Sequence, residues 1–397
     1  MATTITKTVK SSGGDYTSLN AWAASIAGRG ADLTTRDVVE RAECFGFTDT
    51  TAVSISGITT DTTRRVEIST PDTARHGGKW NSSAYILATT NAPPFSATIG
   101  HLVLDGLQFS SAPTYSSGTR YVSYAQTSTA TAPYCYFINC IYGESNANNI
   151  GPAFQNAYTS SGNTATIVAK CCLVHSSAGV AHAFKNTNVL RCNFYAYNCT
   201  ACISGVGYYR TVSKNCIANG VSDGYDTCTG DYNVSSLSSD APGSNSRVGN
   251  VVFVNASGYD YHLSASDTVA RAAGSNLSSD TVYPFSTDID DQAIATWSIG
   301  ADAQAQLLQT SGPAWVNRGI AWTGQSTGFV NIYPDETPTV LIDASATAHV
   351  SAVALVRKVA IVAGSTISKA AAAATATKRA SRSEERRVGK ECRSRWS

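Results

Sequence analysis

Carboxylates are the first side chains in this sequence whose types and spacing could do chemistry. Asp290 and Asp291 are adjacent, whereas Asp105 and Glu144 are far apart and need a fold that brings them together. Paired carboxylates cleave glycosidic bonds, because one protonates the leaving group while the other activates water or attacks the sugar. These four residues are therefore the candidates for catalysis, with Arg191 or Lys214 as basic partners for Asp105 and Glu144.

A second acidic group could bind a metal ion. Asp223, Asp226 and Asp231 lie close together with glycines between them, and oxygen-rich loops of this kind bind Ca²⁺. The group lacks the regular spacing and the distal Glu of an EF-hand loop. The favoured interpretation is a solvated turn in which these aspartates cap their own backbone. We therefore expect no cofactor. The alternative is that these three aspartates bind a Ca²⁺ ion.

The eleven cysteines are interpreted as reduced, buried thiols. The N-terminus has no apolar signal core, and disulfide frameworks belong to secreted proteins. His175 and His182 lie near a pair of cysteines, but without the paired spacing of a structural zinc site. Free cysteine is among the most buried residue types, so we expect Cys140, Cys172 and Cys216 to pack in a core.

Basic and aromatic side chains form a third candidate, a glycan-binding surface. Lys170, Arg191 and Lys214 occupy the same position in three similar segments, and would form a basic stripe if that position faced outward. Tyr195 and Tyr197 belong to a set of tyrosines whose rings could stack on sugar faces. Alternating tyrosines can equally pack strand faces against each other, and both interpretations stay open.

Short β-rich segments must position these residues. Between residues 37 and 300, runs of β-branched and apolar residues are separated by Gly, Asn, Ser, Thr and Asp, which predicts an all-β architecture. One helix is expected before them, over about residues 17–27, because apolar residues recur there at helical spacing. Its apolar stripe consists of Leu19, Trp22, Ala23 and Ile26.

Five of the β-rich segments align as a repeat. Each ends in a large apolar residue that follows a small or polar one, and equivalent positions are 34, 32, 21 and 23 residues apart. A period just above 20 with occasional longer intervals is typical of a β-solenoid whose insertions form loops. The alternative is a β-sandwich, which would not place equivalent residues in register at this period. The segments are 103–107, 137–141, 169–173, 190–194 and 213–217.

Three sequence features carry a family resemblance. Residues 13–22 read Gly-Gly-Asp-Tyr-Thr-Ser-Leu-Asn-Ala-Trp, Asn-Cys-Ile recurs at 139–141 and 215–217, and residues 260–302 contain Asp-Tyr-His-Leu, Asp-Ile-Asp-Asp and Trp-Ser-Ile-Gly-Ala-Asp. They resemble the cap helix, the repeated coils and the closing segment of the pectin-lyase-like superfamily. Phage and environmental members are especially similar.

The resemblance implies a single-stranded right-handed parallel β-helix with an N-terminal cap helix. The sequence departs from the family pattern at Asp291, where Gly is usual, and at Ser298 before Ile299. The hydrolase pattern of the family, with Asn-x-Asp, Asp-Asp and Gly-His-Gly on successive coils, is not found. Asp290 and Asp291 lie in the closing segment and not on a central coil, which argues against catalysis by this pair.

The chain is expected to contain more than the β-helix. We assign 1–303 to the β-helix, 304–311 to a linker, 312–365 to a small C-terminal β module and 366–381 to a low-complexity end. Residues 382–397 are dense in charge and resemble a translated sequencing adapter, so we treat them as non-native and exclude them from fold reasoning.

Composition limits the function classes. The net charge of +1 argues against nucleic-acid binding, and the sequence has no apolar run of membrane-spanning length. We expect a non-catalytic structural or adhesive protein, made in the cytoplasm and located in a virion or outside the cell without a classical signal peptide.

The expected role is that of a phage virion or tail appendage. Its partners would be a polysaccharide or cell-surface glycan, together with a homotrimer or other virion proteins. One alternative is a polysaccharide lyase or glycoside hydrolase on the same scaffold, and another is a bacterial surface protein.

Overall fold

The computed structural model describes residues 2–90, 92–111, 121–125, 130–144, 151–156, 164–176 and 180–302, and four short strands between residues 308 and 330. The chain divides into two units, Met1–Gln304 and Ala305–Ser397. The first unit holds all the candidate residues.

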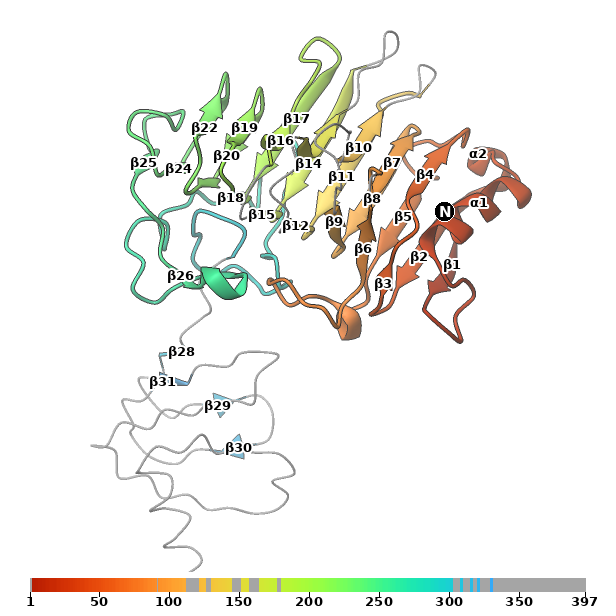
Figure 1. The fold of residues 1–397 in the computed structure, drawn as a ribbon, viewed down its shortest axis with the longest axis horizontal. Helices are drawn as coiled ribbons and strands as arrows, with labels where there is room; N and C mark the ends of the chain where they lie inside the picture. Colours follow the sequence, from red (N-terminus) through yellow and green to blue (C-terminus); the bar gives the residue numbers. More distant parts are fainter. Residues whose placement is uncertain are drawn as a thin grey trace, which may run out of the picture. The chain divides into compact units, whose positions relative to one another are not determined.

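The first unit is a right-handed parallel β-helix built from three long sheets (Figure 1). Sheet I consists of β1 (Thr3–Val9), β2 (Val38–Cys44), β5 (Val66–Ser69), β8 (His101–Asp105), β11 (Tyr134–Ile138), β14 (Ala165–Lys170), β17 (Cys192–Tyr197), β20 (Val212–Lys214) and β23 (Thr229–Asp231). Sheet II consists of β3 (Thr48–Asp49), β6 (Ile86–Thr89), β9 (Gln108–Ser111), β12 (Ile141–Glu144), β15 (Leu173–Ser176), β18 (Thr200–Cys202), β21 (Ile217–Ala218), β24 (Val234–Ser235) and β25 (Arg247–Val248). Sheet III consists of β4 (Val53–Ser56), β7 (Phe95–Thr98), β10 (Val122–Ala125), β13 (Pro152–Asn156), β16 (His182–Lys185), β19 (Val206–Tyr209) and β22 (Asp223–Asp226).

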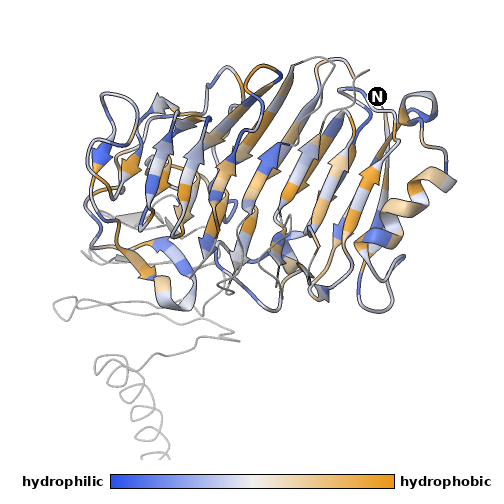
Figure 2. Ribbon diagram, turned by 45° about the horizontal axis from the view of Figure 1, so that its top comes forward, coloured by the Kyte–Doolittle hydropathy of each residue, from blue (hydrophilic) through white to orange (hydrophobic). Residues whose placement is uncertain are grey.

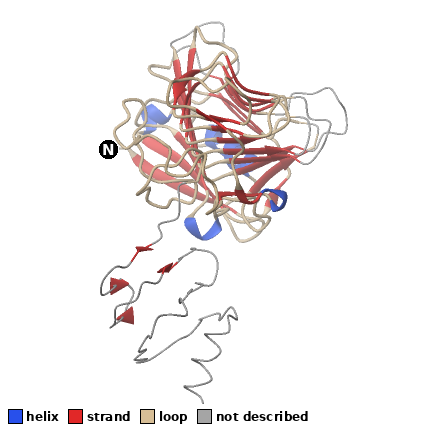
Figure 3. Cartoon of the chain, turned by 90° about the vertical axis from the view of Figure 1, so that its left-hand side faces the viewer, coloured by secondary structure: helices blue, strands red, loops and turns tan. Residues whose placement is uncertain are grey.

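Each complete coil passes through sheet I, sheet II and sheet III in turn, so strands surround a central core (Figure 3). Successive side chains of a strand point to opposite faces, and burial alternates accordingly along β4 and at the end of β8. Hydrophobic and hydrophilic residues are interspersed along the strands (Figure 2). On sheet III the inward residues form an aromatic stack. Phe154, Phe184, Tyr208 and Tyr225 pair in register, with successive ring centroids 5.6, 5.1 and 4.9 Å apart.

The corner between sheets I and II is two residues long and repeats from coil to coil. Its first residue has a positive φ, at Gly106, Asn139, Cys171, Asn198 and Asn215, where φ is between 48° and 72°. Glycine and asparagine adopt this left-handed conformation at the lowest cost, which explains the recurring Asn before Cys.

The second corner residue points inward and forms a ladder of thiols, which confirms the predicted burial of the cysteines. The ladder runs Cys140, Cys172, Cys199 and Cys216, and each Sγ donates to a backbone carbonyl of the preceding coil at 3.1–3.6 Å. The sequence alignment placed Gly106 and Asn193 in this column, and both placements are wrong. Leu107 corresponds to Cys140 in the strand register, and Cys199 occupies the third rung.

The cap helix forms at the expected place. Helix α1 (Leu19–Gly28) follows Ser18, whose Oγ accepts from the backbone N–H of Ala21 at 3.2 Å, and α2 (Leu33–Arg36) comes next. The predicted apolar stripe of α1 is buried over the first coils, with Trp22 fully covered. Gly28 is the last helical residue, and Gly30 takes the left-handed conformation instead.

A closing segment, residues 264–302, returns along the corner between sheets I and II. It follows an antiparallel hairpin of β26 (Phe253–Asn255) and β27 (Asp260–Leu263). Two short 3₁₀ turns, η1 (Asp72–Ala74) and η2 (Ala256–Gly258), complete the first unit. Backbone bonds hold the segment on the coils, including Gly300 N–H to the Asn215 carbonyl at 2.7 Å.

In the second unit, β28 (Leu308–Gln309) pairs with β31 (Phe329–Val330), and β29 (Trp315–Val316) pairs with β30 (Ile320–Ala321), both antiparallel. β28 falls within the range assigned to a linker from the sequence. The rest of 312–365 and the assigned segments 366–381 and 382–397 lie outside the described residues.

We predict that Trp22→Ala lowers the free energy of unfolding by about 3–5 kcal/mol, because it leaves a cavity under the cap helix. Trp22→Phe should cost much less, since the indole N–H has no hydrogen-bond partner in the structure. Denaturant unfolding of both variants checks this, with Ala24→Ser on the exposed face of α1 as the control. Equal losses for both Trp22 variants would contradict the packing argument.

Candidate functional site

A groove of about 700 Å³ lies on the outer face of sheet I, across β2, β5, β8 and β11. One wall consists of aromatic rings on β11 and in the closing segment, and the rest is lined by ion-paired side chains together with small polar and aliphatic residues. The residues that matter most below are Arg41, Arg65, Glu67, Arg75, Asp105, Tyr134, Tyr136 and Tyr283.

The aromatic wall is rigid because its rings pack against each other. Tyr134 and Tyr136 are two residues apart on β11, so both point outward, and their rings stack at 4.4 Å. The edge of Tyr283 packs against Tyr136 at 4.9 Å, and Tyr134 contacts the ring of His101 at the same distance. Two aromatic rings are therefore held in fixed orientation beside the groove.

Across the floor, Glu67 joins two arginines. Its carboxylate lies 2.6 Å from both Arg41 and Arg65, and the two arginine side chains stay 38% and 31% exposed. Partly exposed pairs of this kind contribute little to stability. They do present several fixed donors and acceptors to a ligand in the groove.

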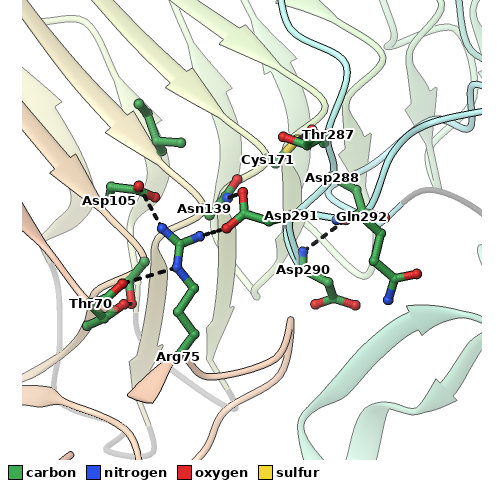
Figure 4. Close-up of polar contacts among 12 residues, drawn as sticks. Thr70, Arg75, Asp105, Asn139, Cys171, Thr287, Asp288, Asp290, Asp291 and Gln292 are labelled. Carbon is green, nitrogen blue, oxygen red and sulfur yellow. Dashed lines mark hydrogen bonds and ion pairs between the residues drawn. The ribbon is translucent and has the colours of Figure 1, made fainter. Parts of the chain in front are cut away.

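Arg75 joins the groove to the closing segment (Figure 4). Its guanidinium lies 2.6 Å from Asp105 Oδ2, pairs with Asp291, and donates through Nε to the Thr70 carbonyl at 3.2 Å. Asn139 Nδ2 donates to the other oxygen of Asp291 at 2.7 Å. Two of the four catalytic candidates, Asp105 and Asp291, therefore meet at a single arginine.

Two effects shift the pKa of the Asp105 carboxyl in opposite directions. Burial raises the pKa of this carboxyl, while the charge of Arg75 lowers it, and the net shift is upward. Asp105 Oδ1 is also buried without a hydrogen-bond partner in the structure. A carboxyl with a raised pKa is suited to proton donation.

The predicted basic stripe of Lys170, Arg191 and Lys214 is wrong. Lys170 pairs in register with Tyr197, Tyr197 pairs with Lys214, and Arg191 lies before β17, outside this column. Lys170 is only 2% exposed, and its ammonium donates to Asn139 Oδ1, Thr287 Oγ1 and the Asp288 carbonyl. The repeat was misaligned because the loop before Cys192 does not belong to the sheet.

Tyr195 and Tyr197 do not face an open surface. Tyr197 is fully buried, and both rings belong to a cluster with Leu277, Tyr283 and other apolar residues of the closing segment. Lys214 covers the Tyr197 ring at 5.3 Å and pairs with Asp280 at 2.7 Å. The closing segment therefore occupies this half of sheet I, and the groove lies over the other half.

Asp290 points away from Asp291 (Figure 4) and joins a second polar cluster. Its Oδ2 lies 3.0 Å from His262 Nε2, and Asp260 Oδ1 lies 2.5 Å from His262 Nδ1. Burial lowers the pKa of His262, but hydrogen bonds to Asp260 and Asp290 outweigh this and raise it to about 11. Burial raises the pKa of nearby Asp302 to about 8.

The remaining candidates do not converge. Asp223 and Asp226 lie on sheet III and Asp231 on sheet I, where Asp231 accepts from the backbone N–H groups of Tyr232 and Asn245 as a turn cap would. Glu144 ends β12, and its side chain lies outside the described residues.

Sequence reasoning missed two residues that organise these sites. Arg75 stands outside the repeated segments, and nothing in its local spacing marks it. His262 lies in the Asp-Tyr-His-Leu segment but was not among the predicted site residues. Tyr134 and Tyr136, which alternate on one strand and form the wall of the groove, belong with Tyr195 and Tyr197 to the tyrosines that were candidates, from the sequence, for stacking on sugars.

Comparison with known proteins adds no family to this description. No protein-family model matches the chain, and a search of curated proteins finds no match either. Among the described residues, no helix is long and apolar enough to cross a membrane.

His175 shows how the hairpin is attached to sheet II. Its ring is 3% exposed and lies between Tyr259 and Tyr261, with centroids 4.8 and 5.5 Å away, and against the edge of Trp80. Neither ring nitrogen has a hydrogen-bond partner in the structure. Burial lowers the pKa of His175 to about 4, so the ring is neutral at pH 7.

The lowered pKa predicts a loss of stability in acid. The unfolded state binds a proton near pH 6.5 and the folded state does so only near pH 4, so stability falls as the pH drops through this window. From pH 7 to pH 5, His175→Phe should lose about 2 kcal/mol less unfolding free energy than the wild type. Denaturant unfolding at the two pH values measures this, and identical losses in both proteins would contradict it.

Proposed function

We propose that this protein is a non-catalytic β-helix that binds a glycan in the groove on sheet I. The observation that carries the proposal is the rigid pair Tyr134 and Tyr136 beside a row of partly exposed ion pairs. An aromatic face covers the apolar face of a sugar ring, and adjacent charged groups bond its hydroxyls. The groove combines both.

The charge of the groove favours an uncharged or weakly charged glycan. Its arginines are already paired with carboxylates, so a ligand carboxylate would have to displace an existing partner. The buried Lys170 removes the basic stripe that would have attracted an acidic chain. The ionisable groups of the lining are Arg41, Arg65, Arg75, Glu67, Asp72 and Asp105.

The biological setting that we propose is a structural or adhesive appendage of a phage virion or tail. The resemblance of residues 13–22 and of the Asn-Cys-Ile segments to phage members of the pectin-lyase-like superfamily supports it. In this setting the protein binds a polysaccharide or cell-surface glycan. It is incorporated into the virion as a homotrimer or together with other virion proteins. A bacterial surface protein is the alternative on the same evidence.

We predict that Tyr136→Ala weakens glycan binding by about tenfold, which corresponds to about 1.4 kcal/mol of lost stacking. A glycan array identifies the ligand, and calorimetry then measures its affinity. Tyr209→Ala on sheet III is the matched control and should leave binding unchanged. Equal effects of both substitutions, or an array without any bound glycan, would remove the proposal.

Cleavage of the bound glycan is a second candidate function. Asp105 and Arg75 line the groove, Asp291 pairs with the same arginine from outside the lining, and the raised pKa of Asp105 suits a general acid. A retaining or inverting hydrolase needs two carboxylates on either side of the bond. The pairing of both with one arginine also has a purely structural explanation, since it holds the closing segment in place.

An assay for new reducing and unsaturated ends separates the two functions. If the protein hydrolyses its ligand, Asp105→Asn should lower the rate by at least about 100-fold, because the acid is lost. Asp223→Asn, on sheet III, should leave the rate unchanged. Binding without new ends supports the non-catalytic function and rules out this second candidate.

A further inference from the structure

We propose that His262, Asp290 and Asp302 bind a divalent metal ion, for which Zn²⁺ is the best match. One ligand atom from each of the three residues lies within 4.8 Å of the other two. Bonds of 2.0–2.2 Å to one tetrahedral zinc ion place the ligand atoms about 3.3–3.6 Å apart. His262 Nε2 and Asp290 Oδ2, at 3.0 Å, would have to separate by a few tenths of an ångström to reach this spacing.

Asp290 supplies a second observation, because one of its oxygens pairs with His262 while the other has no partner. Its side chain is 10% exposed, and its Oδ1 is buried with no hydrogen-bond partner in the structure. A buried carboxylate oxygen without a partner is costly, and a metal ion would satisfy it.

The backbone of Gly78 packs directly against two of these ligand atoms. A Cβ at this position would lie 2.1 Å from Asp290 Oδ1 and 2.4 Å from His262 Nε2, so any other residue would displace them. The left-handed backbone of Gly78, with φ +68°, also disfavours other residues.

The surroundings fit a metal-bound histidine. Asp260 Oδ1 accepts from His262 Nδ1, which orients the ring so that Nε2, now paired with Asp290, is the nitrogen that would bind an ion. Asp260, Asp288, Asp290 and Asp302 bring four carboxyl groups together here, and the described basic side chains beside them are His262, Lys79 and Lys170. A divalent ion that replaces the Nε2 proton adds positive charge where the carboxylates gather.

The donor set selects the kind of metal. Imidazole nitrogen suits Zn²⁺ and related transition metals better than Ca²⁺ or Mg²⁺, which prefer oxygen alone. The three residues come from β27 and from two parts of the closing segment. A bound ion would therefore clamp the hairpin to the last residues of the first unit.

The test uses the full chain after removal of metal with a chelator. Calorimetry and elemental analysis should find one Zn²⁺ per chain, and saturating Zn²⁺ should raise the unfolding midpoint by about 5 °C. His262→Gln and Asp302→Asn should each weaken Zn²⁺ binding at least about 100-fold. Asp260→Asn should weaken it about 10–100-fold, since Asp260 only orients the histidine.

Two controls separate this site from others. Asp291→Asn, in the same turn but directed toward Arg75, should leave Zn²⁺ affinity unchanged. Co²⁺ should bind without the near-ultraviolet charge-transfer band of thiolate ligands, which excludes the cysteines.

Three results would overturn the proposal. They are the absence of stoichiometric Zn²⁺ in the loaded protein, an unchanged Zn²⁺ affinity in Asp260→Asn, and a thiolate band in the Co²⁺ spectrum. Circular dichroism shows which variants are folded. If His262→Gln and Asp302→Asn are not folded, the Zn²⁺ affinity of Asp260→Asn decides whether the proposal stands. None of these results depends on whether the groove binds a glycan.

Discussion

The two-residue corner between sheets I and II is the constraint on which the rest of the structure depends. At this corner the backbone N–H of the left-handed residue donates to the next coil, for example from Asn139 to the Lys170 carbonyl and from Cys171 to the Tyr197 carbonyl, both at 2.9 Å. A coil that changed the length of the corner would lose these bonds and shift every side chain on sheet II to the opposite face. The corner therefore fixes the register of the whole stack.

The same corner holds the closing segment. Asn215 exchanges two hydrogen bonds with Ser275 at 2.8 Å, and Lys170 bonds to Thr287 and Asp288. Burying an ammonium is costly unless acceptors surround it, and Lys170 has three. Because the segment is fixed in this way, it covers one half of sheet I, brings Asp291 to Arg75 and carries Tyr283 to the wall of the groove.

The fold could be predicted from the sequence because its signals are local. An Asn followed by Cys indicates the left-handed corner, and the apolar stripe that includes Trp22 indicates the cap helix. The strand register could not be predicted where loops of different length precede a strand. For this reason Arg191 was aligned with Lys170, whereas Tyr197 is the residue that pairs with Lys170.

The sites were less predictable, because they depend on contacts between distant segments. Arg75 reaches Asp291 across 216 residues, and no local pattern encodes that pairing. The difference between Asp290 and Asp291 follows from alternate directions of two adjacent side chains in a turn, which composition and spacing do not reveal.

The thiol ladder gives the interior a chemical property that its packing alone does not suggest. Cys140 and Cys199 are fully buried, and burial raises the pKa of each thiol well above its usual value. Reagents that attack thiolates can reach these sulfurs only after the coils separate. The buried cysteine thiols are therefore spaced one coil apart along the core. The order in which they react with a thiol reagent would show where along the solenoid unfolding begins.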